Sequence, residues 1–141
     1  MRQLEPYPLW IGNSTEARDI RRILAAGIGA IIDLALSEPP IAVTREVVYC
    51  RFPLVDGVGN PPWLVRVAVE TTASLIRAKV PTLSCCGAGM SRSPAVTAAA
   101  LALAERRDPA ECLELIAGLG GMDVSPGFWR EVLGVMEARD R

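Results

Sequence analysis

The chain has 141 residues, enough for one domain with its own core, and a formal net charge of −1. This balance gives no general attraction to nucleic acid or to an anionic membrane surface, so we expect neither partner. No apolar run approaches the roughly 20 residues that a membrane-spanning helix needs. Histidine is absent, which excludes Cys–His and Ser–His nucleophile pairs, histidine bases and histidine-containing metal sites.

The four cysteines also lack the C-x2-C pairs of a zinc site, so we expect no metal and no cofactor. Cys85 and Cys86 are adjacent, which is awkward for an ordinary disulfide. The opening residues MRQLEPYPLW contain no apolar stretch of a signal peptide. These features indicate a cytoplasmic protein with reduced thiols, and we expect a monomer.

Alternating strand and helix patterns run along the chain. Ser14 is the expected cap of the first helix, Asp108 with Glu111 has the order that starts another, and Ser125 starts the last. Such alternation predicts an α/β domain, spanning 1–141, with a central and mostly parallel sheet covered by helices on both faces. The predicted elements are strand 8–12, helix 15–27, strands 29–36 and 46–55, helix 63–79, strand 80–85, and helices 94–107, from 109 and from 126.

The stretch LSCCGAGMSRSPAV, residues 83–96, gathers groups that bind anions. A predicted strand ends at Cys85, a glycine-rich turn follows, and a helix begins near Arg92. Loop amides and a helix N-terminus together form an anion site, and with Arg92 they favour the thiolate form of Cys86, a nucleophile. The planar Arg92 side chain can hold two oxygens of a phosphate. The plain alternative is a buried free cysteine in an ordinary turn. The candidate phosphate-binding residues are Gly87, Ala88, Gly89, Met90, Ser91 and Arg92.

CCGAGMSRS resembles the signature of the cysteine-dependent protein phosphatases, in which a histidine precedes Cys-x-x-Gly-x-x-Arg-Ser/Thr. The AG and SRS pairs are most similar to the dual-specificity subfamily of the protein tyrosine phosphatases. Residues 9–34 resemble the subfamily's opening strand, helix and strand, residues 49–60 its general-acid loop, and residues 125–133 its last helix. The resemblance implies a protein tyrosine phosphatase-like fold. The chain departs from the pattern at Cys85, where the family usually has a histidine that supports the nucleophile.

The resemblance also implies catalytic roles. Cys86 would attack phosphorus and form a phosphocysteine intermediate, while Arg92 and the loop amides hold the phosphoryl group. Asp56 would protonate the leaving group and then act as the base. Its plain alternative is an ordinary turn aspartate, and Asp33 is a rival acid for which capping or a backbone hydrogen bond is the simpler role. Ser93 would donate to the Cys86 sulfur, and it can also cap the helix.

Three further residues carry weaker expectations. Ser91 is expected to support the loop. Trp63 is expected to pack under the acid loop, with a substrate platform as its alternative. Cys50 lies on a strand expected beside the Cys86 strand, which predicts a reversible Cys50–Cys86 disulfide after oxidation; the alternative is a small buried apolar residue.

The sequence thus predicts a hydrolase, a protein phosphatase of the dual-specificity type. It would dephosphorylate phosphotyrosine, with phosphoserine and phosphothreonine as further candidates, so its partner would be a phosphorylated protein or a small phosphoester. A non-catalytic pseudophosphatase is the main alternative, and Cys85 is the only feature that favours it. A phosphatase for a non-protein phosphoester also stays open. Thiol-type arsenate reductases that share the Cys-x5-Arg loop place it near the N-terminus, unlike this chain.

Overall fold

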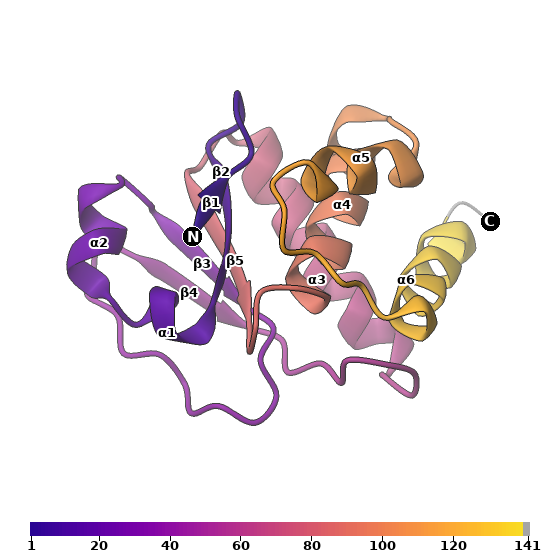
Figure 1. Cartoon of the computed structure of the whole chain (residues 1–141), viewed down its shortest axis with the longest axis horizontal. Coiled ribbons are helices and arrows are strands. Elements are labelled where there is room, and N and C mark those ends of the chain that lie inside the picture. The colour runs from indigo at the N-terminus through magenta and orange to yellow at the C-terminus, as the bar shows by residue number, and fades with distance from the viewer. Residues whose placement is uncertain (140–141) are drawn as a thin grey trace.

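A five-stranded sheet lies at the centre of the computed structural model, which describes residues 1–139 (Figure 1). Its strand order is β1-β2-β5-β3-β4. Strands β2, β5, β3 and β4 run parallel, and only β1 is antiparallel to its neighbour β2, so the predicted, mostly parallel sheet is confirmed. The strands are β1 Arg2–Gln3, β2 Leu9–Asn13, β3 Ala30–Asp33, β4 Val48–Arg51 and β5 Thr82–Cys86.

Helices cover both faces of this sheet, as predicted. Two short helices, α1 and α2, lie over one face, and the four longer ones pack on the other (Figure 1). The last two helices begin at the predicted prolines. None of the helices within residues 1–139 is long and apolar enough to cross a membrane. The helices are α1 Ser14–Ala17, α2 Ile20–Ala25, α3 Pro62–Arg77, α4 Arg92–Glu105, α5 Pro109–Ala117 and α6 Pro126–Arg139.

The first predicted helix, 15–27, is in fact two helices, and its cap is Asn13 rather than Ser14. The Asn13 side chain accepts the backbone N–H of Glu16 at 2.8 Å, and the Glu16 carboxylate accepts the backbone N–H of Asn13 at 3.0 Å. This reciprocal pair is a capping box, and it makes Ser14 the first residue of α1. Asp19 then interrupts the helix and caps α2.

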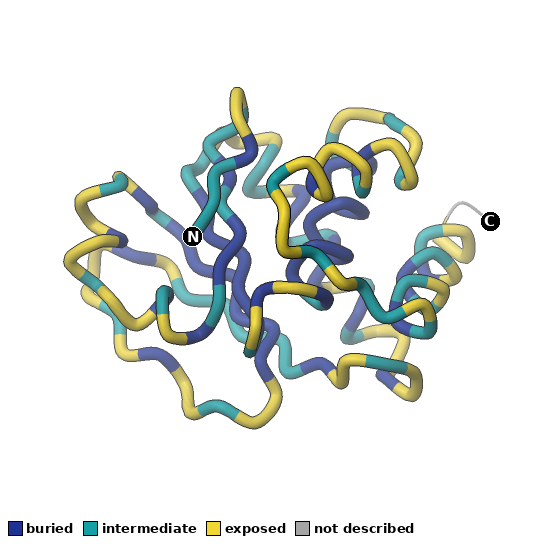
Figure 2. Tube along the Cα trace, in the orientation of Figure 1, coloured by how far each residue is buried: buried dark blue, intermediate teal, exposed yellow. Residues whose placement is uncertain are grey.

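Helix α4 forms the centre of the second layer. All ten residues from Ser93 to Ala102 are buried (Figure 2), because α3, α5 and α6 surround the helix and the sheet lies against it. Five of these residues are alanines, which allow neighbouring helices to approach closely. The carboxyl ends of the parallel strands meet at one edge of the sheet, and β5 joins α4 there through residues 87–91. In open α/β sheets this edge is where ligands bind.

Candidate active site

The segment from Cys86 to Arg92, called here the 86–92 loop, folds tightly against the neighbouring β2–α1 turn. Gly89 has φ +72°, and a Cβ there would lie 2.7 Å from the Gly12 carbonyl oxygen, so only glycine fits. The Ser14 hydroxyl donates to the Cys86 carbonyl at 3.3 Å, and the Ser14 N–H donates to the Gly87 carbonyl at 3.4 Å. These two hydrogen bonds orient the Cys86 and Gly87 carbonyls toward α1 and hold the loop in place.

The two adjacent cysteines point to opposite faces of the sheet, since side chains alternate along a strand. Cys86 faces the α3–α6 layer, is only 2% exposed, and has its Sγ 3.4 Å from the Ser93 Oγ. Cys85 faces the α1–α2 layer and has its Sγ 3.9 Å from the Asp33 Oδ1. Cys86 therefore has a hydroxyl partner, whereas Cys85 has a carboxylate.

Arg92 is held with one edge of its guanidinium unoccupied. Its Nη1 donates to the Leu54 carbonyl at 2.8 Å and more weakly to the Leu34 carbonyl at 3.4 Å. The Nε is buried without a hydrogen-bond partner among the described residues, and the Nη2 lies 3.2 Å from the position that a Gly87 Cβ would occupy. A buried donor without a partner is costly, and an oxyanion accepting from this edge would remove that cost.

Asp56 shares a cavity with the candidate nucleophile. The Ser91 Oγ donates to the Asp56 carboxylate at 2.6 Å and itself accepts the Ser125 N–H at 2.8 Å. Ser91 thereby links the 86–92 loop, the Asp56 turn and the start of α6. The cavity measures about 210 Å³ and is lined by Asp56, Cys86, Ala88, Met90, Ser91, Arg92 and Asp123.

The turn that carries Asp56, residues 55–60, is held by hydrogen bonds within the turn and by hydrogen bonds to α6. Inside, the Asn60 side chain accepts the Val55 N–H at 2.7 Å and donates to the Val55 carbonyl at 3.0 Å. Outside, the Glu131 carboxylate on α6 accepts the N–H groups of Gly59 at 2.8 Å and Asn60 at 3.0 Å. The turn is thus held against α6 with Asp56 at the cavity.

Asp33, the rival acid, is occupied elsewhere. It is 1% exposed, accepts the Ala35 N–H at 3.0 Å and accepts the Tyr49 hydroxyl. Burial, and then the hydrogen bond to Asp33, raises the pKa of Tyr49 to about 12. Burial, followed by the Asp33 charge, raises the pKa of the Cys85 thiol far above its ordinary value, so Cys85 is a neutral thiol. These groups lie on the α1–α2 side of the sheet, away from the cavity.

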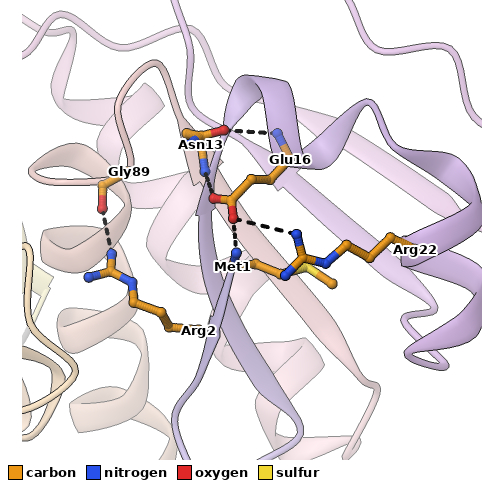
Figure 3. A network of polar contacts seen from close by, with 6 residues as sticks. All are labelled: Met1, Arg2, Asn13, Glu16, Arg22 and Gly89. Carbon is orange, nitrogen blue, oxygen red and sulfur yellow. Dashed lines mark hydrogen bonds and ion pairs between the residues drawn. The ribbon is translucent and has the colours of Figure 1, made fainter.

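The N-terminal strand braces the 86–92 loop from a third side (Figure 3). The Arg2 guanidinium donates to the Gly89 carbonyl at 3.2 Å. It also donates to the carbonyl of Gly120, in the segment between α5 and α6. Beside it, the Glu16 carboxylate joins the Asn13 backbone N–H, the Met1 amino group and Arg22. Sequence reasoning missed Arg2 because a two-residue strand has no pattern of its own.

Two expectations are wrong. The Cys50 strand does not lie beside the Cys86 strand, because β3 separates β4 from β5. Two strand spacings place the Cα atoms roughly 9 Å apart or more, beyond the reach of a disulfide without backbone movement. Trp63 does not pack under the acid loop, since its side chain is 62% exposed at the start of α3.

No family model and no curated protein matches the chain in sequence. Solved structures do match over the whole length. Human DUSP28 superposes with a TM-score of 0.85 at 20% identity, covering 99% of this chain and 98% of that one. The chain has the dual-specificity phosphatase fold. The predicted fold class is therefore confirmed, and the resemblance to the dual-specificity phosphatases holds at the level of the fold.

Other structures with the dual-specificity phosphatase fold differ in what they are described to do. The human tyrosine phosphatase-like serine/threonine/tyrosine-interacting protein matches with a TM-score of 0.82 at 16% identity, covering 100% and 98% of the two chains. OH1 from the Orf virus, described as a tyrosine phosphatase with triple substrate specificity, matches with a TM-score of 0.74 at 21% identity, covering 96% and 85%. Identities this low establish the fold, and the chemistry must be argued from the residues of this chain.

Proposed function

We propose that the protein is a phosphomonoester hydrolase that works through a phosphocysteine on Cys86. One observation carries the proposal: a single cavity brings Cys86, Arg92 and Asp56 together, although Asp56 lies on a separate segment of the chain. The unpartnered Nε of Arg92 and the loop amides would bind the phosphoryl oxygens. Phosphotyrosine in proteins is the proposed substrate, with phosphoserine and phosphothreonine as further candidates.

Each step of the reaction assigns a role to one of these groups. The Cys86 thiolate attacks phosphorus, the bond from phosphorus to the leaving oxygen breaks, and Asp56 gives that oxygen its proton. A water then attacks the phosphocysteine, and Asp56 takes a proton from it. The sulfur–phosphorus bond breaks, inorganic phosphate forms, and the Ser93 hydroxyl, 3.4 Å from the Cys86 sulfur, stabilises the departing thiolate.

The test is hydrolysis of p-nitrophenyl phosphate and a panel of phosphotyrosine, phosphoserine and phosphothreonine peptides, with a chelator present. We expect turnover by the natural chain and none by Cys86→Ser, which should still bind inorganic phosphate. Turnover that survives in Cys86→Ser but is lost in Cys85→Ser would show that the wrong thiol has been assigned. A small non-protein phosphoester hydrolysed faster than every peptide would move the substrate assignment.

A second candidate is a phosphate-binding module without turnover. The observation that favours it is the neutral, wholly buried Cys85 thiol at the position where the family usually has a histidine. On this reading, the natural chain and Cys86→Ser would bind phosphopeptides equally well and neither would release phosphate. The same panel therefore separates the two candidates.

A further inference from the structure

The candidate phosphate cavity contains a carboxylate that the proposed reaction does not use. Asp123 lines the cavity together with Cys86 and Arg92. Asp56 has an assigned role and accepts a hydrogen bond from Ser91. In contrast, no described residue donates a hydrogen bond to the Asp123 carboxylate or forms an ion pair with it. A carboxylate in an anion site opposes the binding of a dianion, so its presence needs a physical reason.

Asp123 is held at the cavity by its backbone. Its N–H donates to the Met90 carbonyl at 2.8 Å, so the residue follows the 86–92 loop. Two residues later, the Ser125 N–H donates to the Ser91 hydroxyl at 2.8 Å. Arg2 ties the preceding Gly120 carbonyl to the same loop. The charge therefore stays at the rim of the cavity.

A second carboxylate approaches the loop from another side. The Glu38 Oε1 lies 2.8 Å from the position that a Cβ on Gly87 would take. Arg51 on β4 donates to the backbone carbonyls of Leu36 and Glu38 at 3.4 and 3.3 Å, and the Arg92 Nη2 lies 3.2 Å from the same Gly87 Cβ position. No ion pair joins Glu38 to an arginine among residues 1–139. Asp123, beside Met90, and Glu38, beside Gly87, thus both lie close to the 86–92 loop and are called here the acidic rim, although only Asp123 lines the cavity.

We propose that the acidic rim selects phosphoesters that carry a cationic group beside the phosphate, above all phosphopeptides with arginine or lysine next to the phosphorylated residue. This inference rests on the proposed function. The cavity of about 210 Å³ has room for a phosphorylated side chain but not for the rest of a peptide, so neighbouring peptide residues lie at the rim. A cation there offsets the repulsion from the rim, whereas a second anion adds to it.

Coulomb's law gives the size of the effect. One charge facing another at roughly 7 Å near a protein surface changes binding by about 3- to 10-fold, with the larger value at low salt. Basic peptides should therefore exceed neutral ones by this factor, and neutral ones should exceed acidic ones. Polyanions such as nucleotide triphosphates and polyphosphorylated lipid headgroups should be poor substrates for the same reason.

The experiment compares three phosphotyrosine peptides that differ only in having basic, neutral or acidic neighbours. We expect kcat/KM to fall from the basic to the neutral to the acidic peptide by about 3- to 10-fold at each step, mainly through a higher KM. The ratio of kcat/KM between the basic and the acidic peptide, called here the spread, should become smaller in high salt. Asp123→Asn should reduce the spread about 3-fold or more, and Glu38→Gln should do so to a smaller extent. Glu114→Gln, which removes the same charge from the exposed face of α5, is the matched control and should keep the full spread.

Binding of the three peptides to Cys86→Ser separates this inference from the proposed function. If the natural chain hydrolyses nothing but its Cys86→Ser form binds the basic peptide best, the catalytic proposal fails and the charge selection stands. Equal kcat/KM for all three peptides, or a spread that Asp123→Asn and Glu38→Gln both leave intact, would overturn the inference. A spread that Glu114→Gln also abolishes would assign the effect to net charge and overturn it too.

Discussion

Glu131 lies on α6, outside the cavity, yet its removal should impair the chemistry of Asp56. Its carboxylate accepts the N–H groups of Gly59 and Asn60 at 2.8 and 3.0 Å, and these bonds fasten the 55–60 turn. Glu131→Ala removes both. Hydrogen bonds to a charged group contribute about 1.5–3 kcal/mol each. Since water can reach this carboxylate and replace part of the lost bonding, we expect about 2 kcal/mol for the pair, equivalent to about 30-fold in the equilibrium that holds the turn closed.

Glu131→Ala should lower kcat/KM strongly only for substrates whose leaving group must be protonated. For a phosphoserine peptide, kcat/KM should fall about 10- to 30-fold in Glu131→Ala. For p-nitrophenyl phosphate, whose leaving group departs with little protonation, it should fall less than about 3-fold. Glu131→Gln keeps one carbonyl oxygen and should lie between the natural chain and Glu131→Ala. The assay is steady-state kinetics on both substrates at one pH.

Glu137→Ala is the matched control, because this residue is exposed on the same helix. It should leave the ratio of the two kcat/KM values unchanged. If Glu131→Ala lowers both substrates equally, the mutation disturbs the fold rather than the position of Asp56. If it lowers neither, Asn60 and Ser91 alone hold the turn closed, and Glu131 does not position Asp56.

Four further predictions concern the cavity and the strand behind it. Arg92→Lys should lose most of its kcat/KM, because an ammonium cannot replace the planar fork; activity near that of the natural chain would contradict this role. Asp56→Asn should lower turnover of poor leaving groups by about 10²–10⁴, with a smaller loss for activated aryl esters; an equal loss on both would refute the acid role. Cys85→His places an imidazole beside the Asp33 carboxylate and should move the acidic limb of kcat/KM, corrected for substrate ionisation, to lower pH. An unmoved limb in a folded variant would leave the double cysteine without a catalytic explanation. The pKa of Cys85 is raised in the folded state, so the stability it contributes is complete below its unfolded value and is lost as pH rises above it. Denaturant titrations at several pH values between about 8.5 and 10.5 give the free energy of unfolding as a function of pH. This free energy should fall less steeply with pH in Cys85→Ala than in the natural chain, by up to about 1.4 kcal/mol per pH unit. Equal pH dependence in the two chains would show that Cys85 ionises normally.

The parts of the site that sequence could predict are those that are close together in the chain. Cys86 and Arg92 belong to one loop, and the strand before and the helix after them were visible as apolar runs. Asp56 required a family resemblance, because nothing in an Asp-Gly turn shows where it will lie. Asp123 and Glu131 gave no signal at all, because their roles depend on contacts with residues 33 to 72 positions away.

Strand order was the other feature that the sequence did not contain. Alternating elements predict parallel strands, but they do not say which strand is central. Cys50 appeared to neighbour Cys86 because β4 and β5 are consecutive in the chain, yet β3 lies between them. The sequence predicts one helix where the structure has α1 and α2, because the apolar residues keep helical spacing across the break at Asp19.

The separation of the cysteines affects how the protein would recover from oxidation. Cys50 is two strands away from Cys86, and Cys85 points through the opposite face of the sheet. Neither thiol can condense with a sulfenic acid on Cys86 without backbone movement. Reactivation after mild peroxide would then depend on a small thiol diffusing into the cavity, and its rate should rise in proportion to the concentration of that thiol. A chain in which Cys50 or Cys85 is replaced by serine should recover at the same rate, and without such a thiol further peroxide should drive Cys86 to its irreversible acids.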